Sequence, residues 1–519
     1  MIIFDPGVTH IANRSLRREL SFLEILIAGI VGAVGTGVLF APAQMAVEAG
    51  PSLVVAWVLG AIFYTFVSIP LIELALTWPE AGGPARYPLY THGNTLNLLS
   101  SFMNLVWYIF IPPIEALATV EGLSYIFPSL IVPHTTTPTL QGAIVGTLLL
   151  LAFVPFNYFG VKAFGRTTAF AGVIKLLIYV VAALALAFAF FDFRNFTAVK
   201  GGFMPFGFSG VFLAIPLAMF AFGGIRVIPD FAEEVKDKSF LGKAILFTVL
   251  GQTLIYILFS VVFIGGLKWS SLGIAPGNWT AVSNLPGNPF VDLANAVRSS
   301  LALYLTLIVA ILGPFVTGYI YLGSGVRVLF SMARSGYMPK KLNEISESYA
   351  IPYWALVVFA IVAAVLTFLT APVPTIYAML EDAVVGGYLA FATLPASMLA
   401  GHRKNLIPKE YRIPGSWVWA ALAFVSASLI SFWSGWPAVP YAVAIGLAGA
   451  LIFGAAFKVK GGLVNSLWYL AYIGFIVLMT YIGSDGALSV IGFIPASIIV
   501  AVVSVAVFLP WGVLTASSS

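Results

Sequence analysis

The sequence predicts an all-α polytopic membrane protein, and three observations lead to this class. Hydrophobic residues make up 60% of the 519 residues, charged residues only 9%, and the mean hydropathy is +1.01, whereas a soluble domain carries roughly 25% charged residues. Apolar runs of about 18 or more residues, long enough to cross a bilayer as helices, recur along the whole chain. Lys and Arg collect on one side of these runs, as in membrane proteins generally. No polar segment is long enough for a separate soluble domain, so we expect a single membrane domain over residues 1–519.

Fourteen apolar runs are long enough to be candidate spans, and the last four are shorter than the others. In chain order they are Phe22–Val47, Leu53–Trp78, Leu98–Phe127, Leu140–Tyr158, Thr168–Phe191, Val211–Ile228, Phe240–Leu267, Leu301–Ala333, Tyr353–Thr370, Thr375–Leu399, Trp417–Trp433, Tyr441–Phe457, Leu463–Ile482 and Leu488–Leu514. Because each run can bury all of its side chains in lipid or in other helices, we expect about fourteen transmembrane helices.

The distribution of basic residues predicts the orientation of the chain. With a cytoplasmic N-terminus and alternating sides, nineteen Lys and Arg lie inside and four outside; Lys175 and Arg226 lie within spans, which accounts for all 25. This is the positive-inside pattern, and it places both termini on the cytoplasmic side of the cell membrane. The pI of about 9.1 therefore needs no nucleic-acid partner.

Several classes of chemistry have no support in the sequence. Cysteine is absent, which excludes disulfides and thiol catalysis. The four histidines fall outside the spans and far apart in sequence, so no metal site or heme pair is expected. No Ser-His-Asp set or phosphate-binding loop is present. We therefore expect neither an enzyme nor a bound cofactor.

The first span carries glycines where a helix should be continuous. Gly29, Gly32, Gly35 and Gly37 occupy its centre, and Pro42 follows. A broken helix in hydrocarbon leaves backbone groups unpaired at several kcal/mol each by rough estimate, which is tolerable only beside a cavity or a bound solute.

The sixth span offers a second break. It contains Pro216 and the pair Gly223–Gly224, and Pro229 follows its end. Transporters built from two inverted halves bind substrate near the midplane at one discontinuous helix of each half, and the first and sixth spans have the corresponding positions.

Four ordered motifs carry a resemblance to a known family. They are GAVGTGVLFAP at 32–42 with EAGP at 48–51, ELALTWPEAGGP at 73–84, AFGGIR at 221–226 with AEEVK at 232–236, and RVLFSMARSGYMP at 327–339. In these segments the chain resembles the amino acid–polyamine–organocation superfamily of transporters. The resemblance implies a LeuT-like five-plus-five inverted repeat over residues 22–191 and 211–399, followed by four additional helices at 417–514. It also implies alternating access and transport of amino acids or related amines. Fourteen spans are similar to the cationic amino acid transporter branch.

The two breaks define a candidate substrate site. Unwound backbone at Gly35–Gly37 presents N–H groups at the positive end of a half-helix, which suits a carboxylate, and carbonyls at Ala33 and Val34 suit an ammonium group. The sixth span resembles the family's substrate-facing segment. The candidate substrate-binding residues are Ala33, Val34, Gly35, Thr36, Gly37, Phe220, Phe222, Gly223 and Gly224. Close helix packing is the alternative explanation for the glycines, and simple packing is the alternative for the two phenylalanines.

Lys175 lies well inside the fifth span. A mid-span ammonium costs about 2.5–3.5 kcal/mol on insertion scales, so it should face a cavity or a partner. By resemblance to sodium-independent family members, its amine replaces a sodium ion between helices 1, 5 and 8. Burial disfavours the charged form of an amine, so its protonation can alternate during transport. The alternatives are a fixed amine that ties helices together and one that reaches the inner surface.

Arg226 departs from the family pattern, which usually has Asp or Glu at this position. Arginine does not readily release its proton, so it either holds an acidic substrate group or pairs permanently with an intramembrane carboxylate. It also disfavours cationic substrates by repulsion. The candidate partners are Glu115, Glu121, Glu381 and Asp382.

Charged residues also flank the inner ends of the spans. Glu73 and Glu80 border the hairpin after the second span, where Arg86 or Arg334 can form gate salt bridges. Solvated surface charges are the alternative reading.

These observations predict a secondary active transporter of amino acids, neutral or acidic rather than cationic, driven by protons. An amino acid or amine exchanger is an alternative within the same class. From other classes, a membrane sensor or subunit that keeps the fold without transport is the main alternative, and a channel is another. The expected partners are the amino acid, protons and the lipid bilayer.

Overall fold

The computed structural model describes residues 15–133, 135–285, 287–371, 385–484 and 486–516, and their regular structure is helical. In the first half of the chain the α-helices are α1 (Phe22–Ala33), α2 (Thr36–Ala49), α3 (Leu53–Thr77), α4 (Tyr87–His92), α5 (Asn94–Ser124), α6 (Leu140–Ala152), α7 (Val154–Tyr158), α8 (Val161–Ala189), α9 (Arg194–Thr197), α10 (Gly207–Phe220) and α11 (Val227–Asp230). In the second half they are α12 (Phe240–Gly266), α13 (Trp269–Leu272), α14 (Pro289–Ala296), α15 (Ser300–Arg334), α16 (Tyr353–Thr370), α18 (Thr393–Arg403), α19 (Ser416–Trp433), α20 (Ala438–Ala456), α21 (Leu463–Ile482), α22 (Phe493–Val503) and α23 (Leu509–Thr515).

Within the described ranges, twelve helical segments are long and apolar enough to cross a membrane. They are Gly37–Thr77, Asn94–Ser124, Leu140–Tyr158, Val161–Ala189, Gly207–Asp230, Phe240–Gly266, Ser300–Arg334, Tyr353–Thr370, Ser416–Trp433, Ala438–Ala456, Leu463–Ile482 and Phe493–Thr515. This number is two below the fourteen expected spans, for two physical reasons. The first expected span is interrupted, which leaves α1 with only 12 residues and runs α2 into α3. Part of the tenth expected span, residues 375–384, lies outside the described residues.

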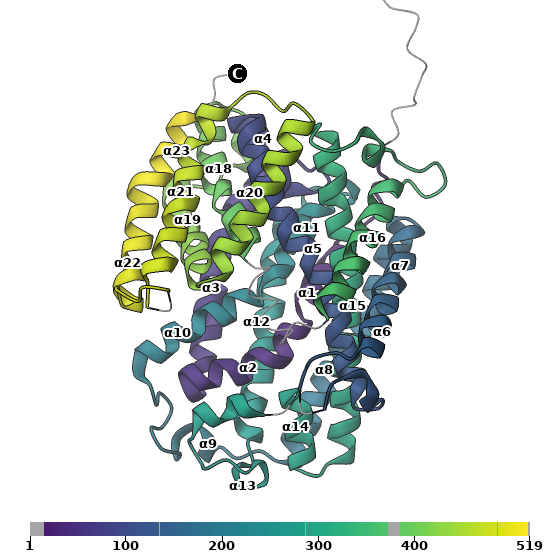
Figure 1. The fold of residues 1–519 in the computed structure, drawn as a ribbon, viewed down its shortest axis with the longest axis vertical. Helices are drawn as coiled ribbons and strands as arrows, with labels where there is room; N and C mark the ends of the chain where they lie inside the picture. Colours follow the sequence, from purple (N-terminus) through teal and green to yellow (C-terminus); the bar gives the residue numbers. More distant parts are fainter. Residues whose placement is uncertain (1–14, 134, 286, 372–384, 485, 517–519) are drawn as a thin grey trace, which may run out of the picture.

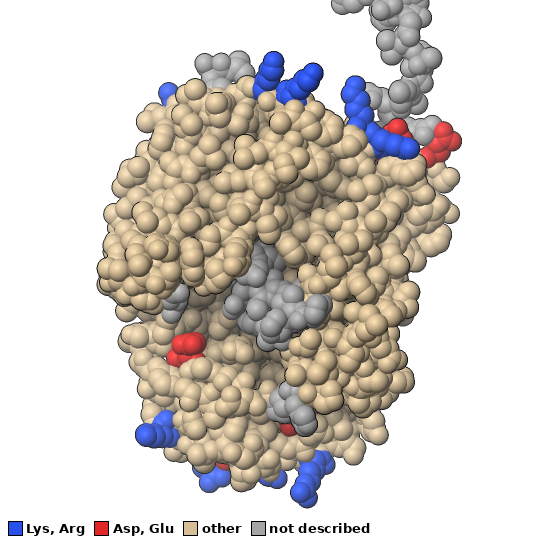
Figure 2. All heavy atoms as spheres, viewed as in Figure 1, with Lys and Arg blue, Asp and Glu red and all other residues tan. Residues whose placement is uncertain are grey.

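The long helices run along the long axis of the molecule (Figure 1), with α19–α23 on one side, α6, α7 and α16 on the other, and α1 and α2 between them. The short helices α9, α13 and α14 lie at the lower end in this view, whereas α4 lies at the upper end. On the face shown in Figure 2, Lys and Arg gather at the upper and lower ends, and the surface between them is almost free of charge. A belt of few charges between two charged ends suits a protein that spans a bilayer.

The first predicted break is confirmed between α1 and α2. Ser21 begins α1 with a capping box, since its hydroxyl accepts from the Glu24 N–H and the Glu24 carboxylate accepts from the Ser21 N–H. The helix ends at Ala33, and Gly35 (φ −112°, ψ −123°) has a backbone conformation far from helical. A new helix then starts at Thr36, so the break falls inside the glycine-rich segment that predicted it.

The second break follows α10. This helix stops at Phe220, and the chain continues through a turn into the 3₁₀ segment η4 (Gly223–Arg226) and the short helix α11. Gly224 allows η4 to approach α1 closely, because a Cβ built on Gly224 would lie 2.1 Å from the Gly29 carbonyl oxygen. Here the glycine serves close backbone packing.

The two broken helices are joined through the segments that precede α1 and follow α11. The Leu20 N–H donates to the Glu234 carbonyl (3.0 Å), and the Lys236 N–H donates to the Leu20 carbonyl (2.9 Å). Leu20 and Val235 thereby form a parallel β-bridge. The segment that enters α1 is therefore held to the segment that leaves α11.

Candidate functional site

A small cavity lies where the two breaks meet. Its volume is about 30 Å³, which is room for about a water molecule and too little for an amino acid with its side chain. The lining residues come from both breaks and from α5 and α15. They are Gly32, Ala33, Gly37, Trp107, Ile111, Glu115, Ala221, Gly223, Thr317 and Tyr321. The cavity is thus closed to a bulky solute in this conformation.

The Lys175 amine extends from α8 to α1 and α15. It is fully buried and donates to the carbonyls of Val31 on α1 (3.0 Å) and Gly313 on α15 (2.8 Å), and to the Thr317 hydroxyl (2.9 Å). It does not extend to the surface, so that alternative is excluded. Three oxygen partners satisfy the three donors of an ammonium group.

Other donors occupy the carbonyls near the first break. The Ala33 carbonyl accepts from the Tyr256 hydroxyl (3.1 Å) and the Val34 carbonyl from the Tyr179 hydroxyl (3.4 Å). The side-chain amide of Gln252 donates to the Gly29 carbonyl (3.0 Å). The sequence reading that left Ala33 and Val34 with free carbonyls is therefore corrected. Two tyrosines far along the chain donate to them, and the Ala33 carbonyl also accepts from the Gly35 N–H (2.8 Å).

Glu115 lies directly against the first break. A Cβ built on Gly35 would approach its two carboxylate oxygens to 2.7 and 2.8 Å and the Thr317 hydroxyl to 2.8 Å. Lys175 is close enough for its charge to interact with that of Glu115. Glu115 is buried and lines the cavity, so it faces the break at Gly35 while Lys175 binds the last turn of α1.

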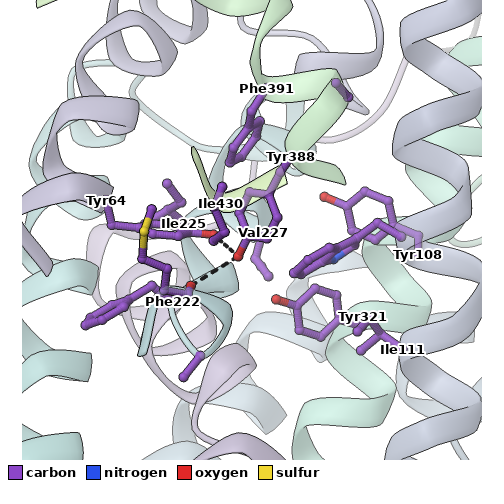
Figure 3. Close-up of a cluster of buried hydrophobic side chains, with 14 of the residues drawn as sticks. Tyr64, Tyr108, Ile111, Phe222, Ile225, Val227, Tyr321, Tyr388, Phe391 and Ile430 are labelled. Atoms are coloured by element: carbon purple, nitrogen blue, oxygen red, sulfur yellow. Dashed lines mark hydrogen bonds between the residues drawn. The ribbon is translucent and has the colours of Figure 1, made fainter. Parts of the chain in front are cut away.

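Arg226 is fully buried among aromatic rings. Its guanidinium lies over Phe391 (3.6 Å to the ring centroid), Trp107 (4.5 Å) and Tyr388 (5.6 Å), which are cation–π distances. Figure 3 shows Tyr388 and Phe391 on neighbouring turns of one helix. The guanidinium donates one hydrogen bond, to the Asn104 side chain (3.1 Å), and its Nε and Nη2 have no hydrogen-bond acceptor among the residues that the structure describes.

Trp107 connects this cluster to the cavity. It lines the cavity while the Arg226 guanidinium lies over its ring. Gly223 is close to the same indole, since a Cβ on Gly223 would lie 2.7 Å from it. The Trp107 side chain thus contacts both the cavity and Arg226.

The structure brings part of the predicted site together and leaves part of it elsewhere. Ala33, Gly37 and Gly223 line the cavity, whereas Gly224 packs against α1. Phe222 does not line the cavity; it is buried beside Tyr64, on the side of the cluster away from Tyr321 (Figure 3). Its alternative reading, simple packing, fits this position. The side chains of Thr36 and Phe220 lie outside what the structure describes.

None of the carboxylates proposed as partners of Arg226 forms an ion pair with it among the described residues. Glu115 faces the first break, and Glu121 lies farther along α5 toward the lower end. Glu381 and Asp382 lie outside the described residues. Permanent pairing with Glu115 is therefore not what the structure shows.

A buried acid that the sequence did not point to lies close to Arg226. Asp230 lies one helical turn beyond it and accepts a hydrogen bond from the Tyr108 hydroxyl. The spacing of four residues could have suggested this neighbour. Tyr108, Trp107 and Tyr321 carry no signal in the sequence alone, because aromatic residues are frequent throughout the spans.

Salt bridges close the upper end of the bundle. Arg86 pairs with Glu80 (2.6 Å), which confirms one expected pair, but Arg334 pairs with Glu233 (2.7 Å). Burial opposes ionisation of Glu233, and the neighbouring Arg334 outweighs it and lowers the pKa of this carboxyl. Glu73 binds His402 instead of an arginine (2.6 Å).

A further salt bridge at the upper end is almost completely buried. Arg327 and Glu234 form a two-pronged ion pair with 4% and 0% of their side chains exposed. Burial raises the pKa of Glu234 despite the attraction of Arg327. Within the described part of the chain, no group of three or more His, Asp or Glu side chains is placed to hold a metal ion.

Two discontinuous helices that meet at a closed central cavity define a membrane carrier of small solutes. The amino acid permease profile matches residues 20–457. The chain belongs to the amino acid permease family, and it is a transporter of amino acids rather than an enzyme.

Three relatives show the range of similar proteins. The aspartate-proton symporter of Bacillus subtilis (strain 168) is 29% identical over 510 residues, which covers 95% of this chain and 96% of that protein. The glutamate/serine transporter AimA of the same organism is 29% identical over 519 residues, covering 96% and 93%. The branched-chain amino acid permease BcaP, also from that organism, is 25% identical over 461 residues, covering 85% and 93%. The similarity is thus to amino acid permeases at large, not specifically to the cationic branch.

Proposed function

We propose that this protein is a proton-coupled symporter of acidic amino acids. The observation that carries the proposal is the fully buried Arg226, with two guanidinium nitrogens lacking acceptors among the described residues, one aromatic ring away from the central cavity. Two relatives named for aspartate and glutamate support it.

The proposed architecture is a five-plus-five inverted repeat over residues 22–191 and 211–399, followed by four helices at 417–514, with fourteen membrane crossings. The two breaks, after Ala33 and after Phe220, lie in the first helix of each repeat. Membership of the amino acid permease family supports this arrangement. The excess of basic residues at one side supports a cytoplasmic location of both termini.

The proposed site binds the groups that all amino acids share at the first break. The N–H groups at the start of α2, around Gly35 and Gly37, receive the α-carboxylate. Glu115 lines the same cavity and receives the α-ammonium. The cavity must widen to admit a substrate, which requires motion of the broken helices relative to α5 and α15.

Lys175 is the proposed coupling residue. Its ammonium holds α1 to α15 through the Val31 and Gly313 carbonyls. Loss of the proton removes the positive charge and one of the three donors, which loosens that connection and favours motion of α1. Protonation from the other side of the membrane restores it.

Arg226 is the proposed selectivity residue. A side-chain carboxylate that displaces Trp107 meets the two unpartnered guanidinium nitrogens, and paired, hydrogen-bonded charges are the form in which a buried arginine is stable. A neutral side chain leaves these nitrogens unpaired.

The coupling role is tested by uptake in proteoliposomes with and without an inward proton gradient. We expect Lys175→Ala to remove the dependence of uptake on pH, whereas Lys162→Ala, at an exposed position of the same helix, should keep it. Normal uptake by Lys175→Ala with unchanged pH dependence contradicts the proposal. Uptake driven by a proton gradient into vesicles that contain no amino acid distinguishes a symporter from an exchanger, which needs an internal amino acid to export.

The selectivity role is tested by competition against labelled aspartate. We expect Arg226→Gln to lower aspartate uptake at least tenfold, by about 1.4 kcal/mol or more of lost binding, while neutral amino acids compete as well as before or better. The matched control is Arg194→Gln, since Arg194 is exposed at the lower end. Retained preference for aspartate in Arg226→Gln contradicts the proposal.

A further inference from the structure

A second pair of acidic residues lies away from the central cavity, at the lower end of the bundle. Glu121 is on the last turn of α5, and Asp292 is on α14. Glu121 is 5% exposed, and its Oε1 has no hydrogen-bond partner among the described residues. The two carboxyl groups are close enough for their charges to interact.

Two helical faces bring these groups together. Tyr125 follows Glu121 by four residues, and its hydroxyl accepts from the Asn288 N–H (2.7 Å). Asp292 follows Asn288 by four residues in turn. Because residues four apart lie on the same helix face, the Tyr125–Asn288 contact sets Glu121 opposite Asp292.

No basic residue among the described residues compensates this pair. The groups acting on Glu121 are burial and Asp292, and those acting on Asp292 are burial and the Gly287 N–H (3.3 Å). The elements packed against α14 are α2, α12, α13 and α15. With the loops that flank α14, they carry Glu48, Lys243, Tyr256, Lys268, Arg298, Tyr304, Tyr319, Tyr321, Arg327 and Arg334. These residues are not among the groups that act on Glu121 or Asp292, whereas Tyr125 is electrostatically linked to both acids.

We propose that Glu121 and Asp292 form a proton-binding site, in which one shared proton holds α14 against the end of α5. Two carboxylates in a poorly hydrated contact repel each other, whereas a carboxyl and a carboxylate share a hydrogen bond. Proton uptake converts one carboxylate to a carboxylic acid and involves no other reactant. When the proton leaves, the repulsion favours separation of α14 from α5, so the contact opens as pH rises.

Burial raises the pKa of Asp292 to about 6. Asp292 therefore titrates in a range that a proton gradient can span. Since the contact does not involve the central cavity, its response to pH does not depend on the transported amino acid.

The chain contains no cysteine, so two introduced cysteines can carry spin labels without a background. Ser129→Cys, after α5, and Asn295→Cys, on α14, are both exposed positions. In this doubly labelled protein, double electron–electron resonance measures the distance between the two spin labels. We expect one short distance at pH 5, and a second population with a longer distance that grows above pH 6. Asp292→Asn, and the double variant with Glu121→Gln, should keep the short distance at both pH values.

Asp192→Asn is the matched control, because Asp192 is an acid at the same end that already pairs with Arg194. It should keep the pH response of the parent. A distance that does not change with pH in the parent overturns the proposal, and so does an unchanged pH response in Asp292→Asn. Aspartate uptake at neutral pH is measured separately. A negative result for the Glu121–Asp292 contact can therefore be distinguished from a loss of the proposed transport activity.

Discussion

Lys175 and Thr317 share the carbonyl oxygen of Val31. Lys175 donates to this oxygen at 3.0 Å and Thr317 at 2.9 Å, while the Thr317 hydroxyl accepts from Lys175 at 2.9 Å. This closed triangle joins α8 and α15 to the last part of α1 before it breaks. The position of Lys175, the proposed coupling residue, is therefore tied to the conformation of α1.

The triangle predicts the effect of Thr317→Val. Valine has a similar volume but no hydroxyl, so Lys175 loses one acceptor and Val31 one donor. An unsatisfied buried donor costs about 1–3 kcal/mol, which should lower the melting temperature by several degrees and reduce uptake.

Thr317→Ser is the control, because it keeps the hydroxyl and should retain both properties. Equal melting temperatures of the valine and serine variants would show that the hydrogen-bonded triangle does not contribute to the stability of the protein.

Gly35→Ala should abolish uptake. The added methyl group would lie within 2.8 Å of Thr317 and of both oxygens of Glu115, closer than non-bonded contacts allow. Either Glu115 or the backbone must move out of the proposed site, and we expect uptake to fall more than tenfold.

The comparison variant is Gly474→Ala, where an added methyl group meets no atom within 4 Å. It should be neutral or slightly stabilising, since alanine is the better helix former. Near-normal uptake by Gly35→Ala would argue against a substrate site at the break.

Glu234→Gln should strongly destabilise the upper end. The substitution leaves the buried Arg327 without its counter-charge, and breaking one partner of a buried pair costs about 3–5 kcal/mol. We expect a large fall in the melting temperature, or an upper end that becomes more accessible to chemical labelling reagents.

Asp192→Asn breaks an exposed ion pair and serves as the reference, with no measurable change expected. Similar melting temperatures for the two variants would contradict the role assigned to the buried pair.

His92 should make stability depend on pH. It is fully buried, donates through Nε2 to the Gly512 carbonyl (2.9 Å) and contacts the Thr91 hydroxyl through Nδ1 (2.8 Å). Burial lowers its pKa from 6.5 to about 4. The unfolded chain therefore binds this proton more readily than the folded protein does, so stability should fall as pH decreases from about 6.5 to 4.

Melting curves across this range test the expectation, with His92→Gln as the variant. It should be less stable than the parent at pH 7.5 but lose less stability on acidification. Parallel curves for the two proteins would exclude His92 as the source.

The sequence anticipated the features that depend on local chemistry. Glycine at position 35 breaks the first span because it has little helix propensity, and a lysine at 175 has to find oxygen partners inside the protein. The features it missed depend on partners far away in the chain. Tyr256 reaches Ala33 and Gln252 reaches Gly29 across 223 residues each, and no local pattern marks either residue. Phe222 was assigned to the site for its residue type, whereas the fold turns it toward Tyr64.

The β-bridge between Leu20 and Val235 has a mechanical consequence. Backbone hydrogen bonds connect the segment before α1 to the segment after α11, so α1 and α11 cannot move apart without breaking these bonds. They would move together as one unit, with the unwound residues of both breaks as the hinges. A force applied at either helix is then transmitted to the other, which makes release of a solute a concerted event rather than two separate ones.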